Sequence, residues 1–306
     1  MKSEKKKTRW PKVVGIMVLL FLLAGGAFAY NVGHSLNKSV KSMYIDLDQN
    51  SDKRNHELVL TKQEPFSVLM LGIDEREGDS GRSDSMIVLT VNPELKSLKI
   101  LSIPRDTRTE IIGQNTTDKI NHAYAFGGVK MSIDTVENFL DIPIDYFLEV
   151  NMDGFKDIVD AVGGVTVQNN LDFTYDNVHF KKGTINLDGV DALKYSRMRY
   201  EGPKGDFSRQ ERQRQIIQAV IKKGASFSTL TNYKDILDVL SKNVKTNLTF
   251  GDMIDIQKNY RDATANLEQM KIKGKDMNID NIYYYIVSKE EQQNIQSQLK
   301  VHLAIK

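Results

Sequence analysis

Short apolar runs alternate with turn-forming residues in the part of the chain that follows residue 62. The runs 66–74, 86–91 and 98–103 are too short for core helices and consist largely of Val, Ile, Leu, Met and Phe. Runs of that length and composition are typical of strands buried on both faces. Asn92 and Pro93 separate the second run from the third, as expected for a turn. We therefore predict three neighbouring strands of one sheet.

Strand and helix patterns alternate further along the chain. Apolar residues recur with the helical period at 131–140 and 154–162, and strand-like runs lie at 146–150 and 165–167. Strands interleaved with helices pack as layers, because each helix buries one face of the sheet.

The last third of the chain, beyond Ser208, has mainly helical patterns until a final strand at 282–287 and a short closing helix. We therefore predict an α/β fold, in which a layered α-β-α domain with a mixed central sheet spans 63–306.

The N-terminal segment carries a different pattern. A basic tail, 1–12, precedes an unbroken apolar run, 13–30, which as a helix would be about 27 Å long and would match the hydrocarbon thickness of a membrane. Basic residues in front of such a helix hold the N-terminus in the cytoplasm. The polar segment 31–62 then reads as a stalk. These features predict a single-pass type II protein of the cell membrane whose main domain is extracellular.

A cleaved signal peptide is the alternative for this segment, because Ala27, Phe28 and Ala29 fit the A-x-A cleavage pattern. The run is longer than a usual signal core, and Trp10 and Tyr30 flank it like interface aromatics. Both features favour the uncleaved anchor.

Composition narrows the class of protein. The 306 residues include no Cys, so an exported domain would hold no disulfide, which fits a bacterial surface better than an animal one. The formal net charge of the chain is +2. The basic tail alone carries +5, so the rest of the chain carries −3. The arginine cluster described below is therefore a local feature in a slightly acidic domain, which argues against nucleic-acid binding.

Charged residues end the predicted strands, where ligands collect in layered α/β folds. Asp74 ends the first strand, and a loop rich in Gly and charge delivers Arg82 and Asp84 before the second. Two carboxylates at the mouth of a sheet suit Mg²⁺, which takes one or two protein oxygens and leaves positions for phosphate. The alternative is structural: Asp74 would cap a turn and Asp84 would pair with Arg82.

Arg105 follows the third strand, and we expect it at the same mouth. It could instead be tied to Asp106 as a surface ion pair.

Arginines are concentrated in 195–199 and 205–214. Ser208 and Glu211 fit a capping box that would start a helix, and on that helix Arg209 and Gln213 share the core-facing stripe. A polar pair at the N-terminal end of a buried stripe needs partners, and an anion would supply them. An ion pair of Arg209 with Asp206 is the alternative.

The same helical wheel places two other arginines, Arg212 and Arg214, on the flanks of that stripe. We expect them to face solvent or the rim of the site.

Seven motifs in order carry a resemblance to a known family. They are LGID (71–74), RSDS (82–85), SIPRD (102–106), KINHAY (119–124), GGV (163–165), YSRMR (195–199) and GDFSRQERQ (205–213). Together they resemble the LytR-CpsA-Psr family over the chain beyond residue 65.

That resemblance implies a phosphotransferase of the cell wall, with its catalytic domain outside the membrane of a Gram-positive bacterium. The enzyme would move an anionic glycopolymer, with wall teichoic acid as the expected polymer, from an undecaprenyl-pyrophosphate carrier to the muramic acid C6 hydroxyl of peptidoglycan. The polyprenyl tail would occupy an apolar tunnel between sheet and helices.

The resemblance also assigns roles to residues. Asp74 and Asp84 would hold Mg²⁺, with Mn²⁺ as a substitute, and Arg82, Arg105 and Asp206 would act in catalysis. Six residues would bind the pyrophosphate: Arg82, Arg105, Arg197, Arg199, Arg209 and Gln213. The base that accepts the acceptor's proton stays open among Asp74, Asp84 and Asp206.

Two other functions remain open at this stage. A pyrophosphohydrolase would use the same metal and arginines but would direct water to the phosphorus. A membrane-bound transcriptional attenuator would bind nucleic acid through 209–214, but the predicted topology places that segment outside the cell.

Overall fold

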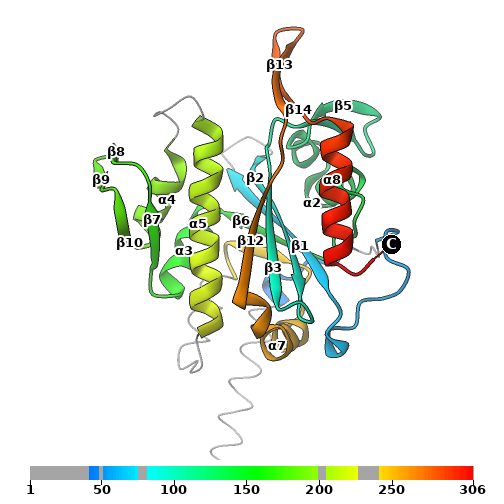
Figure 1. Ribbon diagram of the computed structural model, residues 1–306, viewed down its shortest axis with the longest axis horizontal. Coiled ribbons are helices and arrows are strands. Elements are labelled where there is room, and N and C mark those ends of the chain that lie inside the picture. The colour runs from blue at the N-terminus through cyan, green and yellow to red at the C-terminus, as the bar shows by residue number, and fades with distance from the viewer. Residues whose placement is uncertain (1–40, 48–50, 75–80, 199–204, 227–240, 306) are drawn as a thin grey trace, which may run out of the picture.

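The computed structural model describes residues 41–47, 51–74, 81–198, 205–226 and 241–305 (Figure 1). The predicted cytoplasmic tail, the membrane helix 13–30 and residues 31–40 and 48–50 of the predicted stalk lie outside these residues. Within them, no helix has the length and apolar character needed to cross a membrane.

A mixed central sheet of six strands organises the domain. Its order is β11 (Val244–Thr246), β6 (Tyr146–Asn151), β1 (Phe66–Asp74), β2 (Arg82–Asn92), β3 (Ser97–Ile103) and β12 (Asn266–Lys271). The pairs β1–β6 and β3–β12 are parallel, and the other three neighbours are antiparallel. The mixed sheet predicted from the sequence is therefore confirmed.

Helices cover both faces of this sheet, as Figure 1 shows. On one face α2 (His122–Leu140) and α8 (Lys289–His302) bury the odd-numbered side chains of β1, such as Leu71, against Val136 and Leu299. On the other face α5 (Gly205–Ser226) packs Ile217 near Ile87 of β2. The layered α-β-α arrangement is confirmed.

Smaller elements surround the layers on the described part of the chain. Two helices, α3 (Met152–Ala161) and α4 (Gly189–Arg197), lie beside α5, and α7 (Phe250–Asn259) lies at one end of the sheet (Figure 1). Short 3₁₀ helices span Leu60–Lys62 and Arg261–Ala265. Four hairpin-like pairs complete the fold: β4 (Arg108–Ile111) with β5 (Thr116–Lys119), β7 (Val165–Asn169) with β10 (Gly183–Leu187), β8 (Phe173–Tyr175) with β9 (Val178–Phe180), and β13 (Lys275–Ile279) with β14 (Ile282–Ile286).

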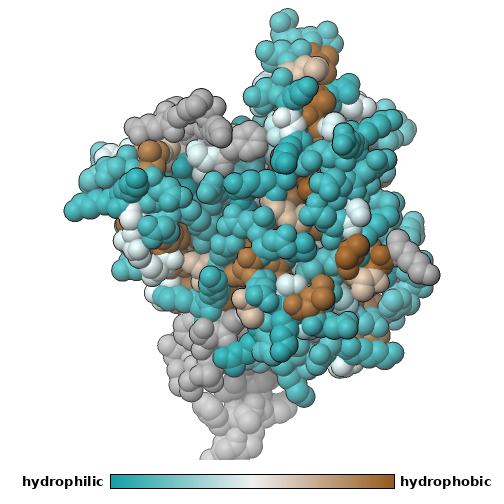
Figure 2. All heavy atoms as spheres, in the orientation of Figure 1, coloured by the Kyte–Doolittle hydropathy of each residue, from teal (hydrophilic) through white to brown (hydrophobic). Residues whose placement is uncertain are grey.

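The β13–β14 hairpin projects from the body of the domain, and apolar atoms lie just below its hydrophilic tip (Figures 1 and 2). Its base is fixed, because the backbone N–H of Tyr285 donates to the carbonyl of Asp106 at 2.8 Å. The hairpin therefore supports the segment that carries Arg105.

Several predicted elements need correction. The strand at 165–167 exists as β7, but it pairs with β10 outside the central sheet. The described residues beyond Ser208 include the helices α5 and α7, but they also include β11 and β12, two strands that were not predicted and that lie at the two edges of the central sheet. Helix α5 begins at Gly205, so Ser208 lies in its first turn and is not its N-cap.

Candidate active site

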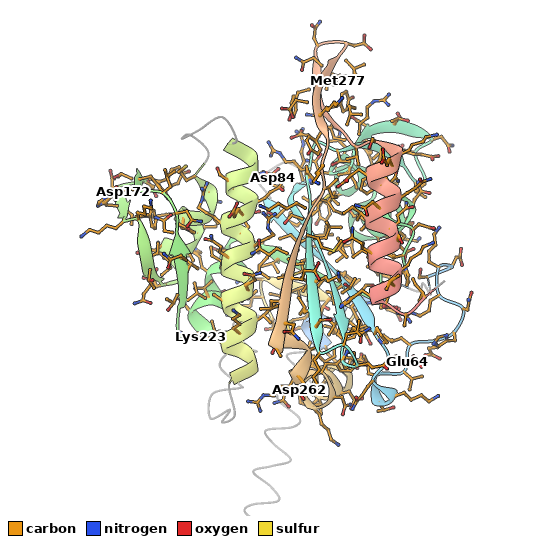
Figure 3. All side chains as sticks on the ribbon, viewed as in Figure 1. Glu64, Asp84, Asp172, Lys223, Asp262 and Met277 are labelled. Carbon is orange, nitrogen blue, oxygen red and sulfur yellow. The ribbon has the colours of Figure 1, made fainter. Side chains whose placement is uncertain are left out.

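A β-bulge places Asp84 at the mouth of the sheet. Gly72 of β1 pairs with Ser85 of β2, but the next residue, Ile73, pairs with Ser83, so Asp84 is the extra residue. A bulge redirects the side chains around it, and here Asp84 and Ser85 both line one cavity. Figure 3 shows Asp84 beside the N-terminal part of α5, at the opposite end of the helix from Lys223. The strand end thus directs a carboxylate toward the helix.

Gly72 permits this arrangement. A Cβ atom added to Gly72 would lie 3.0 Å from the Cβ of Ser85, closer than side chains normally approach. Glycine at this position therefore lets the two strands approach closely next to the bulge.

Arg105 reaches the same mouth from the loop after β3. Its Nη1 donates to Oδ1 of Asp84 at 2.6 Å, and both side chains are about one-quarter exposed. Its Nε lies farther, at 3.6 Å, from Oδ2 of Asp106, whose other oxygen accepts from Nζ of Lys119 at 2.6 Å. The alternative pairing with Asp106 is therefore present as a longer contact, but Asp84 at the mouth is the closer partner.

Helix α5 supplies the polar pair that its periodicity predicted. Arg209 is buried, and its Nη2 lies 3.4 Å from the backbone carbonyl of Asp84. One turn later, the side-chain oxygen of Gln213 accepts from the hydroxyl of Ser85 at 2.8 Å. The two contacts tie α5 to the bulge of β2.

These side chains line a cavity of about 1020 Å³ between the sheet and α3, α4 and α5. Its volume is at the upper end of the range for ligand pockets. Six of the predicted site residues line it: Arg82, Asp84, Arg105, Arg197, Arg209 and Gln213. The structure thus brings together residues from four separate motifs.

The rest of the lining is mainly apolar. The sheet contributes Met70, Ile87, Leu89, Leu148 and Val150, and the helices contribute Phe155, Ile158, Leu193, Ile216, Ile217, Val220 and Ile221. Sequence reasoning predicted an apolar tunnel but did not choose its residues. The sequence did carry a signal for these residues. Side chains alternate between the two faces of a strand, and Met70 of β1 and Ile87 and Leu89 of β2 lie on the face that α5 covers.

Three predicted site residues cannot be placed in this cavity. Arg199 lies outside the described residues. Asp74 and Asp206 belong to β1 and α5, but their side chains lie outside the described part of the structure. The backbone of Asp74 pairs with Arg82 in the β1–β2 ladder.

Arg212 and Arg214 were predicted to face solvent or the rim of the site, and that prediction was wrong. Both are buried, with 6% and 3% of their surface exposed. Arg212 donates to the backbone carbonyls of Tyr195 and Met198, and Nε of Arg214 lies 3.4 Å from Oε1 of Gln269. Burial lowers the pKa of both guanidinium groups.

The physical reason is that α5 packs between two apolar clusters. Ile216 belongs to a cluster formed with α4 and β7–β10, and Ile217 packs on a second cluster over the central sheet. A helix with two buried sides leaves little room for solvent on its flanks. Because Arg209, Arg212 and Arg214 are all buried, they do not form the exposed basic surface that binding of nucleic acid requires.

A model described as the LytR_cpsA_psr family matches residues 30–301 of the chain. The chain belongs to this family. The resemblance inferred from the seven motifs is therefore confirmed.

Relatives within the LytR_cpsA_psr family share most of the chain. The polyisoprenyl-teichoic acid--peptidoglycan teichoic acid transferase TagU of Bacillus cereus is 52% identical over 304 residues, which is 99% of both proteins. The crystal structure of B. subtilis TagU is 48% identical, with a TM-score of 0.65, and the match covers 79% of this chain and 98% of that one. The family protein YwtF (TagT), solved with bound octaprenyl pyrophosphate lipid, is 31% identical, with a TM-score of 0.68 and coverage of 86% and 100%.

The donor set at the cavity mouth of this family member fits a divalent cation. Asp84 supplies a partly exposed carboxylate that lines the cavity, and the backbone of Asp74 lies on the adjacent strand. No group of three or more acidic, His or Cys side chains gathers among the described residues. Mg²⁺ does not need one, because it binds through one or two carboxylates plus phosphate oxygens and water.

Proposed function

We propose that this protein is a transferase that moves an anionic glycopolymer, wall teichoic acid, from an undecaprenyl-pyrophosphate carrier to the muramic acid C6 hydroxyl of peptidoglycan. One observation carries the proposal: a single cavity joins a cationic mouth to an apolar interior. A pyrophosphate attached to a long hydrocarbon chain has the same two parts. The TagU relative named as a teichoic acid transferase supports the choice of polymer.

The arginines at the mouth would bind the pyrophosphate. Guanidinium groups present paired N–H donors that match phosphate oxygens, and they keep their charge at any working pH. Arg82, Arg197 and Arg209 all line the cavity; the first two are exposed and Arg209 is buried. These donors would meet the phosphates while the apolar lining holds the prenyl chain.

The reaction needs no protein nucleophile. The acceptor hydroxyl would attack the phosphorus next to the sugar, the bond from that phosphorus to the bridging oxygen would break, and undecaprenyl phosphate would leave. Such transfers depend mainly on positioning and on charge stabilisation, which Arg82 and Arg105 would supply in catalysis. The hydroxyl proton would pass to Asp74, Asp84 or Asp206, and Asp84 is the one whose side chain lines the cavity.

Asp74 and Asp84 would hold Mg²⁺, or Mn²⁺ in its place. The bound ion would neutralise charge that develops on the pyrophosphate oxygens. The segment 13–30 would anchor the protein in the cell membrane with the catalytic domain outside, where the lipid carrier and peptidoglycan both lie.

A transfer assay tests this function. Full-length protein in nanodiscs would receive a synthetic prenyl-pyrophosphate glycolipid with a labelled sugar, Mg²⁺ and uncrosslinked peptidoglycan oligomers. We expect label on the glycan, and label transfer about a hundredfold slower or more with Arg105→Ala. Label that appears only as free sugar phosphate would identify a pyrophosphohydrolase and would overturn the proposal.

A further inference from the structure

Arg212 is a buried cation that the proposed chemistry does not use. Its Nε donates to the backbone carbonyl of Tyr195 at 2.8 Å, and its Nη2 donates to the carbonyl of Met198. The guanidinium carbon lies 5.6 Å from the centre of the Phe173 ring and 5.8 Å from that of Tyr195. The Arg212 side chain therefore connects α5 to the C-terminal end of α4, through two hydrogen bonds and through contacts with two aromatic rings.

The two carbonyls bracket a residue of the site. Helix α4 ends at Arg197, and Met198, with ψ of 130°, already leaves the helical conformation. Arg197 lies between Tyr195 and Met198 in the sequence, and it lines the mouth of the cavity. The last carbonyls of a helix have no partner within the helix, so a cation that donates to them stabilises this end.

A second contact ties the same turn to α5. The phenol of Tyr195 donates to Oε1 of Gln215 at 3.0 Å, and Tyr195 is fully buried. Burial raises the pKa of Tyr195 to about 12, so the phenol keeps the proton that it donates. The end of α4 is thus held at two points by one face of α5.

We propose that Arg212 is a positioning residue for substrate binding: it fixes the turn at Tyr195–Met198 so that Arg197 faces the pyrophosphate without Arg212 touching the substrate. This proposal rests on the proposed function of the cavity. It adds Arg212, which does not itself contact the phosphates, to the residues on which binding depends.

Only a guanidinium group fits this role. Its planar fork reaches two acceptors in fixed directions, whereas a lysine ammonium is a single point with no fixed plane. Lys at position 212 would keep the charge and lose one of the two carbonyls. The turn would then sample several orientations, and Arg197 would spend less time facing the phosphate.

Arg214 provides a matched control on the same helix. It is as buried as Arg212, and burial lowers the pKa of both. Its Nε lies 3.4 Å from Oε1 of Gln269 on β12, a strand that the turn at Tyr195–Met198 does not contact through Arg212. Arg214→Lys should therefore disturb packing to a similar degree and leave Arg197 in place.

The test measures binding of farnesyl pyrophosphate and of inorganic pyrophosphate to the full-length protein in nanodiscs, by calorimetry, together with Tm. We expect Arg212→Lys and Arg212→Gln to weaken binding of both probes about tenfold or more, as for loss of one charge-assisted phosphate contact. Arg214→Lys should change it less than about twofold at a comparable Tm. Equal weakening by Arg212→Lys and Arg214→Lys would overturn the proposal.

A double-mutant cycle separates positioning from general damage. If Arg212 acts through Arg197, Arg212→Lys should weaken binding little further in an Arg197→Ala background. Additive effects would contradict that route. Because binding is measured without transfer, a wild-type protein that binds both probes but transfers nothing would defeat the proposed function and leave the positioning role standing.

Discussion

Arg105 and Asp84 form an ion pair, with Nη1 of Arg105 at 2.6 Å from Oδ1 of Asp84. The pair joins the loop after β3 to the bulged end of β2, and both residues line the cavity mouth. The arginine is held in place before any substrate arrives. Preorganised donors of this kind stabilise charge in a transition state without reorganisation during the reaction.

Arg105→Ala should therefore lower the transfer rate by about a hundredfold or more, the usual effect of removing one preorganised donor. The rate of label transfer to peptidoglycan oligomers measures this. Arg108→Ala is the control, since Arg108 is exposed and packs near Tyr284 away from the cavity lining. A near-normal rate with Arg105→Ala would remove this residue from the mechanism.

The apolar part of the cavity should select for the length of the prenyl chain. Val220 lines it, so Val220→Trp would shorten the space available and should weaken binding of long prenyl pyrophosphates more than that of farnesyl pyrophosphate. Calorimetry across a series of chain lengths measures the difference. Val190→Trp, at a half-exposed position outside the lining, is the control. Equal losses at every length would show that the chain binds elsewhere.

Gly72→Ala tests the bulge that positions Asp84. The added Cβ would lie 3.0 Å from that of Ser85, so we expect β1 and β2 to move apart slightly and the free energy of unfolding to fall by about 1 kcal/mol. Urea denaturation measures that cost, and the transfer rate should fall as Asp84 moves. In Gly251→Ala the new Cβ meets only an ordinary contact at 3.6 Å, so this variant should not be destabilised. Wild-type stability in Gly72→Ala would show that the strands adapt freely.

The central strands were predictable because β1, β2, β3 and β6 are nearly continuous apolar runs buried by helices on both faces. The edge strands were not. β12 buries only Met270 among its six residues, and β11 has three residues in all, so their local patterns are weak. Such strands form because the neighbouring strand offers free backbone groups, a fact that no local window contains.

The site shows the same division. Its polar residues could be found from motifs and strand ends, since those features are local in sequence. The burial of Arg212 could not, because a helical wheel assumes one buried face, and α5 has a second one against α4 and β7. Packing against α4 and β7, which are distant in sequence from Arg212, buries that side chain.

The stability of the fold should depend on pH through His302. Its ring is buried, with Nδ1 at 2.8 Å from the hydroxyl of Thr90 and Nε2 at 2.8 Å from that of Ser97. Desolvation, helped by nearby Lys99 and opposed by Glu268, lowers the pKa from 6.5 to about 4. The unfolded chain takes up the proton first, so this contribution is complete above pH 6.5 and is lost as pH falls toward 4.

The loss from His302 amounts to roughly 3 kcal/mol at most across that window. Urea unfolding at several pH values measures it in the wild type and in His302→Gln. The variant should be less stable at pH 7, and its unfolding free energy should fall less steeply between pH 6.5 and 4. Parallel curves would show that His302 does not carry the dependence.

Asp84→Asn should change the response to metal as well as the rate. An amide keeps the shape of the side chain but removes the charge that would attract Mg²⁺. The Mg²⁺ concentration that gives half-maximal transfer should therefore rise about tenfold or more. Titrating Mg²⁺ in the transfer assay gives that value, with Mn²⁺ as a second ion. Asp106→Asn is the comparison, because it also removes a negative charge near Arg105 and lies outside the cavity lining. If both variants lowered the maximal rate and left the Mg²⁺ requirement unchanged, Asp84 would serve only to orient Arg105, and the metal would have to bind elsewhere.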